Sequence, residues 1–412
     1  MGTERATELT VLRPEDFDRW WDHLARAFGG TAAAEERALD RSLTEFGRSL
    51  VARDGAEIVG TAGAISFRMT VPGGAEVPVA GVTMVSVAAT HRRRGVLTSM
   101  MRRQLDDVRA LGEPLAVLFA SEPAIYGRFG YGAATLQLAA EIDTSRVSLA
   151  LPAGTEDTRV RYAEPAEVLA ECEAVYAALV PGRPGMLARQ PGWERVALLD
   201  PESEREGASA LQCVVAEREG RVTGYARFRT KMGWGPSGHD GTVTLEGLAA
   251  LDPATGAALW RFLFGLDLMT TLSVRARPVD DAWQYLVDDI RRCRTSVRDG
   301  AQVRLVDVGR ALSARTYQAP LDVVFEVEDA FCPWNAGRWR LTGDTKGASC
   351  ERTTDAADLA LSVRELGAAY LGGVSLLSLA AAGRVREVRP GSLTEASVAF
   401  SSSVPPWLPH GF

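Results

Sequence analysis

Hydrophobic and polar positions change their period several times in the N-terminal third of the chain, and each change predicts an element. Apolar side chains recur at helical spacing over residues 15–29, which predicts an amphipathic helix. Residues 49–71 alternate with period two around an Asp-Gly pair at position 54, which is typical of a β-hairpin. The pattern then predicts a strand over residues 79–89, a helix directly after Gly95, and a buried strand over residues 113–122.

A second segment repeats this layout at an offset of roughly 160 residues, which favours a domain duplication over a solenoid. Residues 216–232 resemble the hairpin, and residues 242–251 resemble the strand that follows it. From Gly300 onward, strand patterns surround an Ala/Leu-rich helical stretch. We therefore expect mixed sheets of the α+β or α/β class in three domains, which span residues 1–150, 151–298 and 299–412.

The composition of the chain argues against several classes of binding partner. The chain has 412 residues, 46 Lys+Arg against 53 Asp+Glu, and a net charge of −7, so its overall field argues against nucleic acid as a partner. Five cysteines without a Cys-x-x-Cys pair, and four histidines without a metal-ligand spacing, indicate neither a disulfide framework nor a metal site. The charged N-terminus lacks a signal-peptide pattern, and no apolar run approaches the ~20 residues of a membrane helix. We expect a cytoplasmic protein with no membrane partner.

Positive charge is concentrated where the predicted strand over residues 79–89 passes into the next helix. Arg92, Arg93 and Arg94 stand in a row and Gly95 follows them. A loop that enters a helix presents free backbone N–H groups and the positive end of the helix dipole, and the glycine allows a tight bend. Such a loop binds anions, above all phosphate. A Walker A or Rossmann site is excluded, because neither glycine-rich pattern is present.

This strand–Arg-x-x-Gly–helix unit resembles the pyrophosphate loop of the GNAT N-acetyltransferases, although Leu97 replaces the last small residue of their pattern. The longer string VSVAATHRRRGVLTSMM, followed by SEPAIYGRFGYG, is similar to the Eis (enhanced intracellular survival) family of GNAT enzymes. The resemblance extends over essentially the whole chain. It implies two tandem GNAT-like domains, followed by a domain like a sterol carrier protein that supplies the C-terminal residue.

The resemblance also assigns roles to individual residues. It implies acetyl-CoA as cosubstrate and no metal. The cofactor-binding residues that it implies are Val85, Ser86, Val87, Arg92, Arg93, Arg94, Gly95, Val96, Leu97, Thr98, Ser121 and Glu122. It makes Tyr126 the general acid and the α-carboxylate of Phe412 the general base, with Phe28 and Met84 at the acceptor side. By itself, Ser121 before Pro123 predicts the N-cap of a short helix.

These roles meet a chemical need. An attacking amine must be neutral, yet a lysine-like amine has a pKa of about 10.4, so a base has to take its proton. The departing thiolate gains from a proton that a nearby tyrosine can supply. A free α-carboxylate is a weak base in water, and the apolar Trp407, Leu408 and Phe412 suggest burial, which would raise its pKa. Backbone N–H groups near Met84 and Val85 are candidates to stabilise an oxyanion.

The second GNAT-like domain has LAALDPATG where the first has its arginines, with Asp252 and Pro253 in place of the cations. An acidic side chain repels pyrophosphate and proline lacks an N–H donor, so we expect only the first domain to bind cofactor. The acidic residues of the first helices fit an acidic substrate entrance and an ordinary exposed face equally well. The third domain has either a lipid cavity or a structural role in presenting Phe412.

The resulting hypothesis is an acetyl-CoA-dependent N-acetyltransferase that acts on primary amines of polycationic small molecules. Aminoglycosides are the substrate class that the resemblance implies, and a homo-hexamer is the assembly that it implies. One alternative is an acetyltransferase of protein lysines or polyamines. An alternative of another class is a non-catalytic protein that binds acyl-CoA or lipid.

Overall fold

The structure is a computed structural model that describes residues 7–30, 33–236 and 238–412. Contacts between residues divide the chain into two compact units. The first unit comprises Met1–Thr135, Ala301–Pro406 and Gly411–Phe412. The second unit comprises Leu136–Gly300 and Trp407–His410. The last six residues are therefore divided between the two units.

The first unit contains a mixed sheet with the strand order β1-β2-β3-β4-β5-β17-β6. Strands β1 to β4 pair antiparallel, whereas β4 and β5 are parallel. The strands of this sheet are β1 (Glu8–Val11), β2 (Leu50–Asp54), β3 (Glu57–Thr70), β4 (Glu76–Val87), β5 (Leu115–Phe119), β6 (Gly132–Ala133) and β17 (Ala301–Leu305). The parallel pair requires a crossover, and helix α3 provides it.

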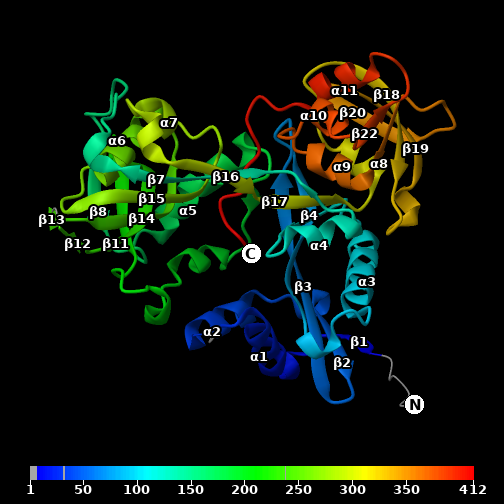
Figure 1. Cartoon of the computed structure of the whole chain (residues 1–412), viewed down its shortest axis with the longest axis horizontal. Helices are drawn as coiled ribbons and strands as arrows, with labels where there is room; N and C mark the ends of the chain where they lie inside the picture. The colour runs from blue at the N-terminus through cyan, green and yellow to red at the C-terminus, as the bar shows by residue number, and fades with distance from the viewer. Residues whose placement is uncertain (1–6, 31–32, 237) are drawn as a thin grey trace. The chain divides into compact units, whose positions relative to one another are not determined.

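Helices cover both faces of this sheet, as Figure 1 shows for α1 and α3. The helices of this part are α1 (Phe17–Phe28), α2 (Ala34–Leu43), α3 (Val96–Ala110) and the short α4 (Pro123–Tyr126). Alternate residues of a strand point to opposite faces. Accordingly Val51 packs with Trp20 of α1, whereas Leu50 and Ala52 pack with Met100 of α3. The expected helices and strands of this segment are confirmed.

The rest of the first unit is a smaller α+β part with the strand order β20-β19-β18-β21-β22. Its strands are β18 (Leu321–Glu328), β19 (Gly337–Asp344), β20 (Gly347–Arg352), β21 (Leu359–Ser362) and β22 (Val385–Glu387), and its helices are α8 (Val308–Ser313), α9 (Val363–Ala369), α10 (Leu376–Ala381) and α11 (Ser392–Phe400). Helix α9 packs tightly against β6. A Cβ atom on Gly132 would lie 2.1 Å from the carbonyl oxygen of Arg364, so only glycine fits there.

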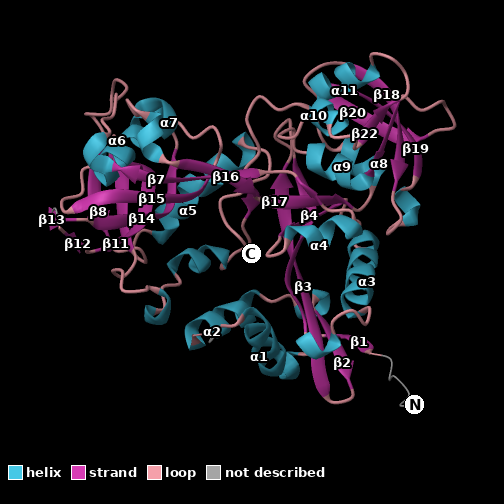
Figure 2. Cartoon of the chain, viewed as in Figure 1, coloured by secondary structure: helices cyan, strands magenta, loops and turns pink. Residues whose placement is uncertain are grey.

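The second unit repeats the mixed sheet with the strand order β16-β7-β15-β14-β11-β10-β8 (Figure 2). Its strands are β7 (Leu136–Asp143), β8 (Arg159–Ala163), β9 (Leu187–Ala188), β10 (Gln212–Arg218), β11 (Arg221–Lys231), β12 (Trp234–Gly235), β13 (Gly238–His239), β14 (Gly241–Ala250), β15 (Met269–Arg277) and β16 (Thr295–Asp299), and its helices are α5 (Leu169–Leu179), α6 (Pro253–Phe264) and α7 (Trp283–Leu286). Cys213 and Val215 face α5, whereas Val214 and Ala216 face α6.

The two sheets exchange strands relative to the predicted domain ranges. Strand β7 falls in the range predicted for the first domain, yet it pairs with β15 in the second sheet. Strand β17 falls in the third range and pairs with β5 in the first sheet. Strands β5 and β15 would otherwise expose unpaired backbone groups along one side, which explains why a strand from outside the predicted range covers each of them. The compact units therefore change at Thr135 and Gly300.

Candidate functional site

The candidate site is a pocket of about 930 Å³ in the first unit, where two parallel strands separate. Strands β4 and β5 are paired from Val79 to Gly81, and their pairing does not continue beyond Gly81. Residues 82–87 of β4 line the pocket that opens there, together with Phe119 at the end of β5. A strand edge released in this way offers backbone N–H and C=O groups to an extended ligand.

Strand β4 is also irregular on its other side. Gly63 stands opposite Thr83 and Thr61 opposite Ser86, so Met84 and Val85 together face a single residue of β3. This is a β-bulge, and Met84 has a positive φ of 53°. The Thr61 hydroxyl stabilises the bulge by a hydrogen bond of 2.8 Å to the Met84 carbonyl oxygen. The bulge turns the backbone at the position where we expect an oxyanion to be stabilised.

The arginine-rich loop lies between β4 and α3, as predicted. Gly95 is the N-cap of α3 with a φ of 81°, and no side chain caps the helix. A Cβ atom on Gly95 would meet no atom of the chain within 4 Å, so packing within the protein does not require a glycine here, whereas the left-handed turn favours one. The uncapped first turn of α3 leaves its N–H groups available to an anion.

His91 holds the base of this loop. It is buried; its Nδ1 lies 2.9 Å from the Thr90 hydroxyl and its Nε2 lies 3.2 Å from Oδ2 of Asp54. The Arg94 guanidinium lies 4.0 Å from the same carboxylate oxygen. Arg94 is therefore directed toward the β2–β3 turn and is absent from the described pocket lining, in contrast to Arg92 and Arg93. The role of Arg94 in cofactor binding stays a prediction.

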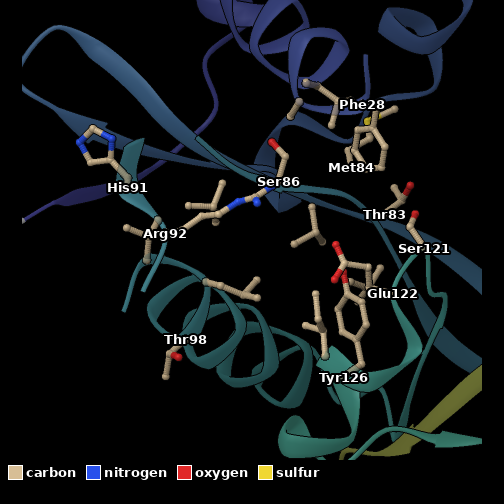
Figure 3. A pocket seen from close by; sticks show the side chains of 18 of the residues that line it. Phe28, Thr83, Met84, Ser86, His91, Arg92, Thr98, Ser121, Glu122 and Tyr126 are labelled. Atoms are coloured by element: carbon tan, nitrogen blue, oxygen red, sulfur yellow. The ribbon is translucent and has the colours of Figure 1, made fainter. Parts of the chain in front are cut away.

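The other residues predicted from the sequence line the same pocket (Figure 3). They are Phe28, Met84, Val85, Ser86, Val87, Arg92, Arg93, Gly95, Val96, Leu97, Thr98, Ser121, Glu122, Tyr126 and Phe412. Figure 3 shows His91 and Arg92 at the left, and Phe28 and Met84 at the upper right. The pocket thus has a basic end at the loop and an apolar end at α1.

Tyr126 ends the short helix α4, and its ring packs edge-on against Tyr131 at 6.0 Å between ring centroids. Burial, and secondarily the charge of Glu122, raise the pKa of Tyr126 above its usual range. The phenol therefore stays protonated at neutral pH and can donate its proton. The N-cap prediction for Ser121 is wrong: the N-cap of α4 is Glu122, without a side-chain hydrogen bond, and Ser121 lies one residue earlier at the pocket wall.

Phe412 places the end of the chain in the pocket. Its ring lies between Phe67 and Phe119, at centroid distances of 5.4 and 5.9 Å. The Thr83 hydroxyl donates a hydrogen bond of 2.7 Å to the main-chain oxygen of Phe412, which belongs to the terminal carboxylate. A Cβ atom on Gly81 would lie 3.1 Å from the Phe412 ring, and closer still to Phe67, so a side chain there would disturb this packing.

Several lining residues were not predicted from the sequence. They are Leu24, Ala27, Asp40, Val82, Thr83, His91, Phe119, Ile125 and Arg128. The helical pattern over residues 15–29 could have indicated Leu24 and Ala27, which share a face with Phe28. No local signal distinguishes Asp40 or Thr83, because only tertiary packing brings α2 and the terminal residue to the strand.

The corresponding position in the second unit differs. Strands β14 and β15 also separate after Leu245, but the Arg277 guanidinium occupies the region beyond and donates a hydrogen bond of 2.7 Å to the Leu248 carbonyl oxygen. The Trp407 indole donates a hydrogen bond of 2.8 Å to the Ala276 carbonyl oxygen beside it. Asp252, as the N-cap of α6, accepts hydrogen bonds from Thr255 at 3.0 and 2.6 Å. An acidic side chain thus fills the place where an anion would bind.

The described residues contain neither a membrane-spanning helix nor a group of metal ligands. No helix in residues 7–30, 33–236 and 238–412 is both long and apolar enough to cross a membrane. Within the same ranges, no three His, Cys, Asp or Glu side chains are grouped so that they could hold a metal ion.

Comparison with protein families finds three matching domains along the chain. Residues 8–134 match an acetyltransferase (GNAT) domain, and residues 185–305 match a second acetyltransferase (GNAT) domain. Residues 308–409 match a sterol carrier protein domain. The predicted fold class, two GNAT-like domains followed by a sterol-carrier-like domain, is confirmed.

Relatives and solved structures cover nearly the whole chain. An uncharacterized N-acetyltransferase of Streptomyces coelicolor is 74% identical over 98% of this chain and 99% of its own length. The N-acetyltransferase Eis of Mycobacterium tuberculosis is 34% identical over 96% of this chain and 98% of its own length. The crystal structure of Eis1 from Mycobacterium abscessus superposes with a TM-score of 0.84 at 33% identity, over 98% of this chain and 100% of that one. This chain therefore belongs to the Eis family of GNAT N-acetyltransferases.

Proposed function

We propose that this enzyme transfers the acetyl group of acetyl-CoA to a primary amine of a polycationic small molecule, with aminoglycosides as one such class. One observation carries the proposal: a single pocket is lined by the arginine loop, by Tyr126 and by the C-terminal Phe412. The acidic net charge of −7 suits a cationic acceptor.

The residues of the pocket fit acetyl-CoA. Arg92, Arg93 and the uncapped first turn of α3 provide positive charge and N–H donors for its phosphates. The released edge of β4 over residues 82–87 provides pairing groups for the amides of its pantetheine arm. Bound acetyl-CoA supplies an acetyl group activated as a thioester.

The chain supplies the acid and the base. The Phe412 carboxylate takes a proton from the attacking amine, and the Thr83 hydroxyl orients that carboxylate. Tyr126, whose raised pKa keeps it protonated, donates its proton to the departing sulfur. The bulge at Met84 and Val85 directs backbone groups toward the negative charge that develops on the acyl oxygen. For the residues to act in this way, the reacting amine of the acceptor has to lie between α1 and the end of β5.

A thiol-release assay with acetyl-CoA and a panel of acceptors tests the proposal. Kanamycin, spermidine and lysine-containing peptides represent the three acceptor classes. We expect the highest kcat/KM with the polycationic small molecules. Turnover restricted to peptides would replace this proposal by a protein lysine acetyltransferase, and CoA binding without turnover of any amine would contradict it.

The family resemblance adds a homo-hexamer and a cytoplasmic location to the proposal. Light scattering coupled to gel filtration measures the molecular mass of the assembly, and cell fractionation measures the location. A monomer at micromolar concentration would contradict the hexamer.

A further inference from the structure

The apolar end of the pocket contains a carboxylate that the chemistry so far described does not use. Asp40 lies on α2 and lines the pocket together with Leu24, Ala27, Phe28 and Met84, which are all apolar. The Trp21 indole donates a hydrogen bond of 3.0 Å to its Oδ2 atom. Trp21 is itself buried, so this bond fixes the carboxylate on a rigid part of the core.

Asp40 differs from Glu113 and Asp16, two other carboxylates of the first unit with little exposure, because no cation of the described residues pairs with it. Glu113 pairs with Arg48 at 2.6 Å, and Asp16 pairs with Arg53 at 2.8 Å. By contrast, no Lys, Arg or His nitrogen among the described residues lies within 4.0 Å of the Asp40 carboxylate.

Burial raises the pKa of Asp40, and the hydrogen bond from Trp21 only partly opposes that effect. A half-buried carboxylate without a cation is energetically unfavourable until a positive group approaches it.

Other acidic side chains of α1 do not share this position. Asp18 and Asp22 lie against Arg37, and neither belongs to the described pocket lining. Their side chains are 64% and 54% exposed. Asp18 and Asp22 thus form exposed ion pairs, whereas Asp40 lies in the pocket lining.

We propose that Asp40 binds a second cationic group of the acceptor and thereby selects diamines and polyamines over monoamines. This inference rests on the proposed function, because it places the reacting amine at Phe412 and Tyr126. The body of the acceptor would then lie along the apolar wall formed by Leu24, Phe28 and Met84. Phe28, which is 59% exposed, offers an apolar surface at the mouth of that wall. Asp40 touches substrate in this arrangement but takes no part in proton transfer.

Acceptors of equal length with one or two amino groups test the contribution of the second cationic group. Straight-chain diamines of increasing length are compared with monoamines of the same length, and KM and kcat are measured for the wild type and for Asp40→Asn. The Asn side chain keeps an oxygen for Trp21 and removes only the charge. We expect KM for the preferred diamine to rise about tenfold, the effect of one charge-assisted hydrogen bond. KM for the monoamine, KM for acetyl-CoA and kcat should stay unchanged.

Two further variants serve as controls. Asp40→Glu keeps the charge and should recover part of the diamine preference. Asp18→Asn removes an equal charge from the exposed face of α1 and should leave the preference intact. Equal losses for diamine and monoamine, or no loss for either, would overturn the role of Asp40.

Calorimetry separates a failure of this inference from a failure of the proposed function. Diamine binding to the CoA-saturated enzyme is measured for the wild type and for Asp40→Asn. Weaker binding by Asp40→Asn supports the inference even if no amine is acetylated, an outcome that would overturn the proposed function alone. Equal binding by both proteins overturns the inference.

Discussion

The two GNAT-like sheets share one layout and differ in what fills the gap between their central parallel strands. In the first sheet, β4 and β5 separate after Gly81 and leave a pocket of about 930 Å³. In the second sheet, β14 and β15 separate after Leu245, but the Arg277 side chain and Trp407 occupy the corresponding region. A separated strand pair is therefore not by itself a binding site.

The loop that follows the central strand also differs between the two units. The first unit has Arg92, Arg93 and a left-handed Gly95 before an uncapped helix, whereas the second has Asp252 as the N-cap of α6. Although partial burial opposes it, hydrogen bonds from Thr255 and the nearby Arg218 lower the pKa of Asp252. Its carboxylate is thus charged at neutral pH and satisfies the N–H groups that an anion would need.

The largest expected effect comes from the end of the chain. Adding Gly-Ser-Gly after Phe412 moves the terminal carboxylate away from the Thr83 hydroxyl. Because a general base contributes about 10²- to 10⁴-fold, we expect kcat to fall by that amount while calorimetric CoA binding and circular dichroism stay unchanged. The same three residues at the N-terminus provide the control. An unchanged kcat would refute the role of the carboxylate.

Tyr126→Phe should give the next largest effect. It removes the phenolic proton and keeps the ring that packs on Tyr131. We expect kcat to fall about 100-fold with KM for acetyl-CoA unchanged. In the second unit, Tyr285 on α7 is 81% exposed, and Tyr285→Phe should change neither constant. A parallel loss of kcat and CoA affinity would assign Tyr126 a structural role.

Replacing the loop cations should weaken cofactor binding without affecting the chemical step. We expect Arg92→Ala with Arg93→Ala to raise KM for acetyl-CoA about tenfold, because charge-assisted contacts to phosphate are lost. Arg94→Ala should have a smaller effect, since Arg94 lies near Asp54 and outside the described pocket lining. Steady-state kinetics at fixed ionic strength measure the difference. Equal effects at all three positions would indicate a diffuse electrostatic contribution.

The smallest effect is expected in the second unit. Asp252→Ala removes the N-cap of α6 and should lower the free energy of unfolding by about 1 kcal/mol. Urea denaturation measures this change. KM for acetyl-CoA should stay as in the wild type, and an altered KM would mean that the second sheet also contributes to cofactor binding.

Local patterns were sufficient to predict much of the fold and many of the residues that line the pocket. Period-two alternation predicted the β2–β3 hairpin, and Gly95 after three arginines predicted the start of α3, because both signals lie within a few consecutive residues. Ser121 was misassigned as an N-cap because helix starts are defined only to within a residue or two by sequence. The sequence could not show that the Arg94 side chain points toward Asp54, unlike those of Arg92 and Arg93. The direction of a side chain within a turn depends on backbone angles, among them the φ of 63° at Arg93.

The sequence by itself determined the family, the duplication and the loss of the cationic loop in the second domain, since these are differences in residue type at corresponding positions. Only the tertiary structure decided which strand completes each sheet, where the terminal carboxylate lies and which acidic side chain reaches the pocket. Phe412 meets Thr83 across 329 positions of the chain, and Asp40 meets Trp21 by the packing of α2 on α1. Contacts of this kind depend on burial and strand pairing over long sequence separations, which no local periodicity encodes.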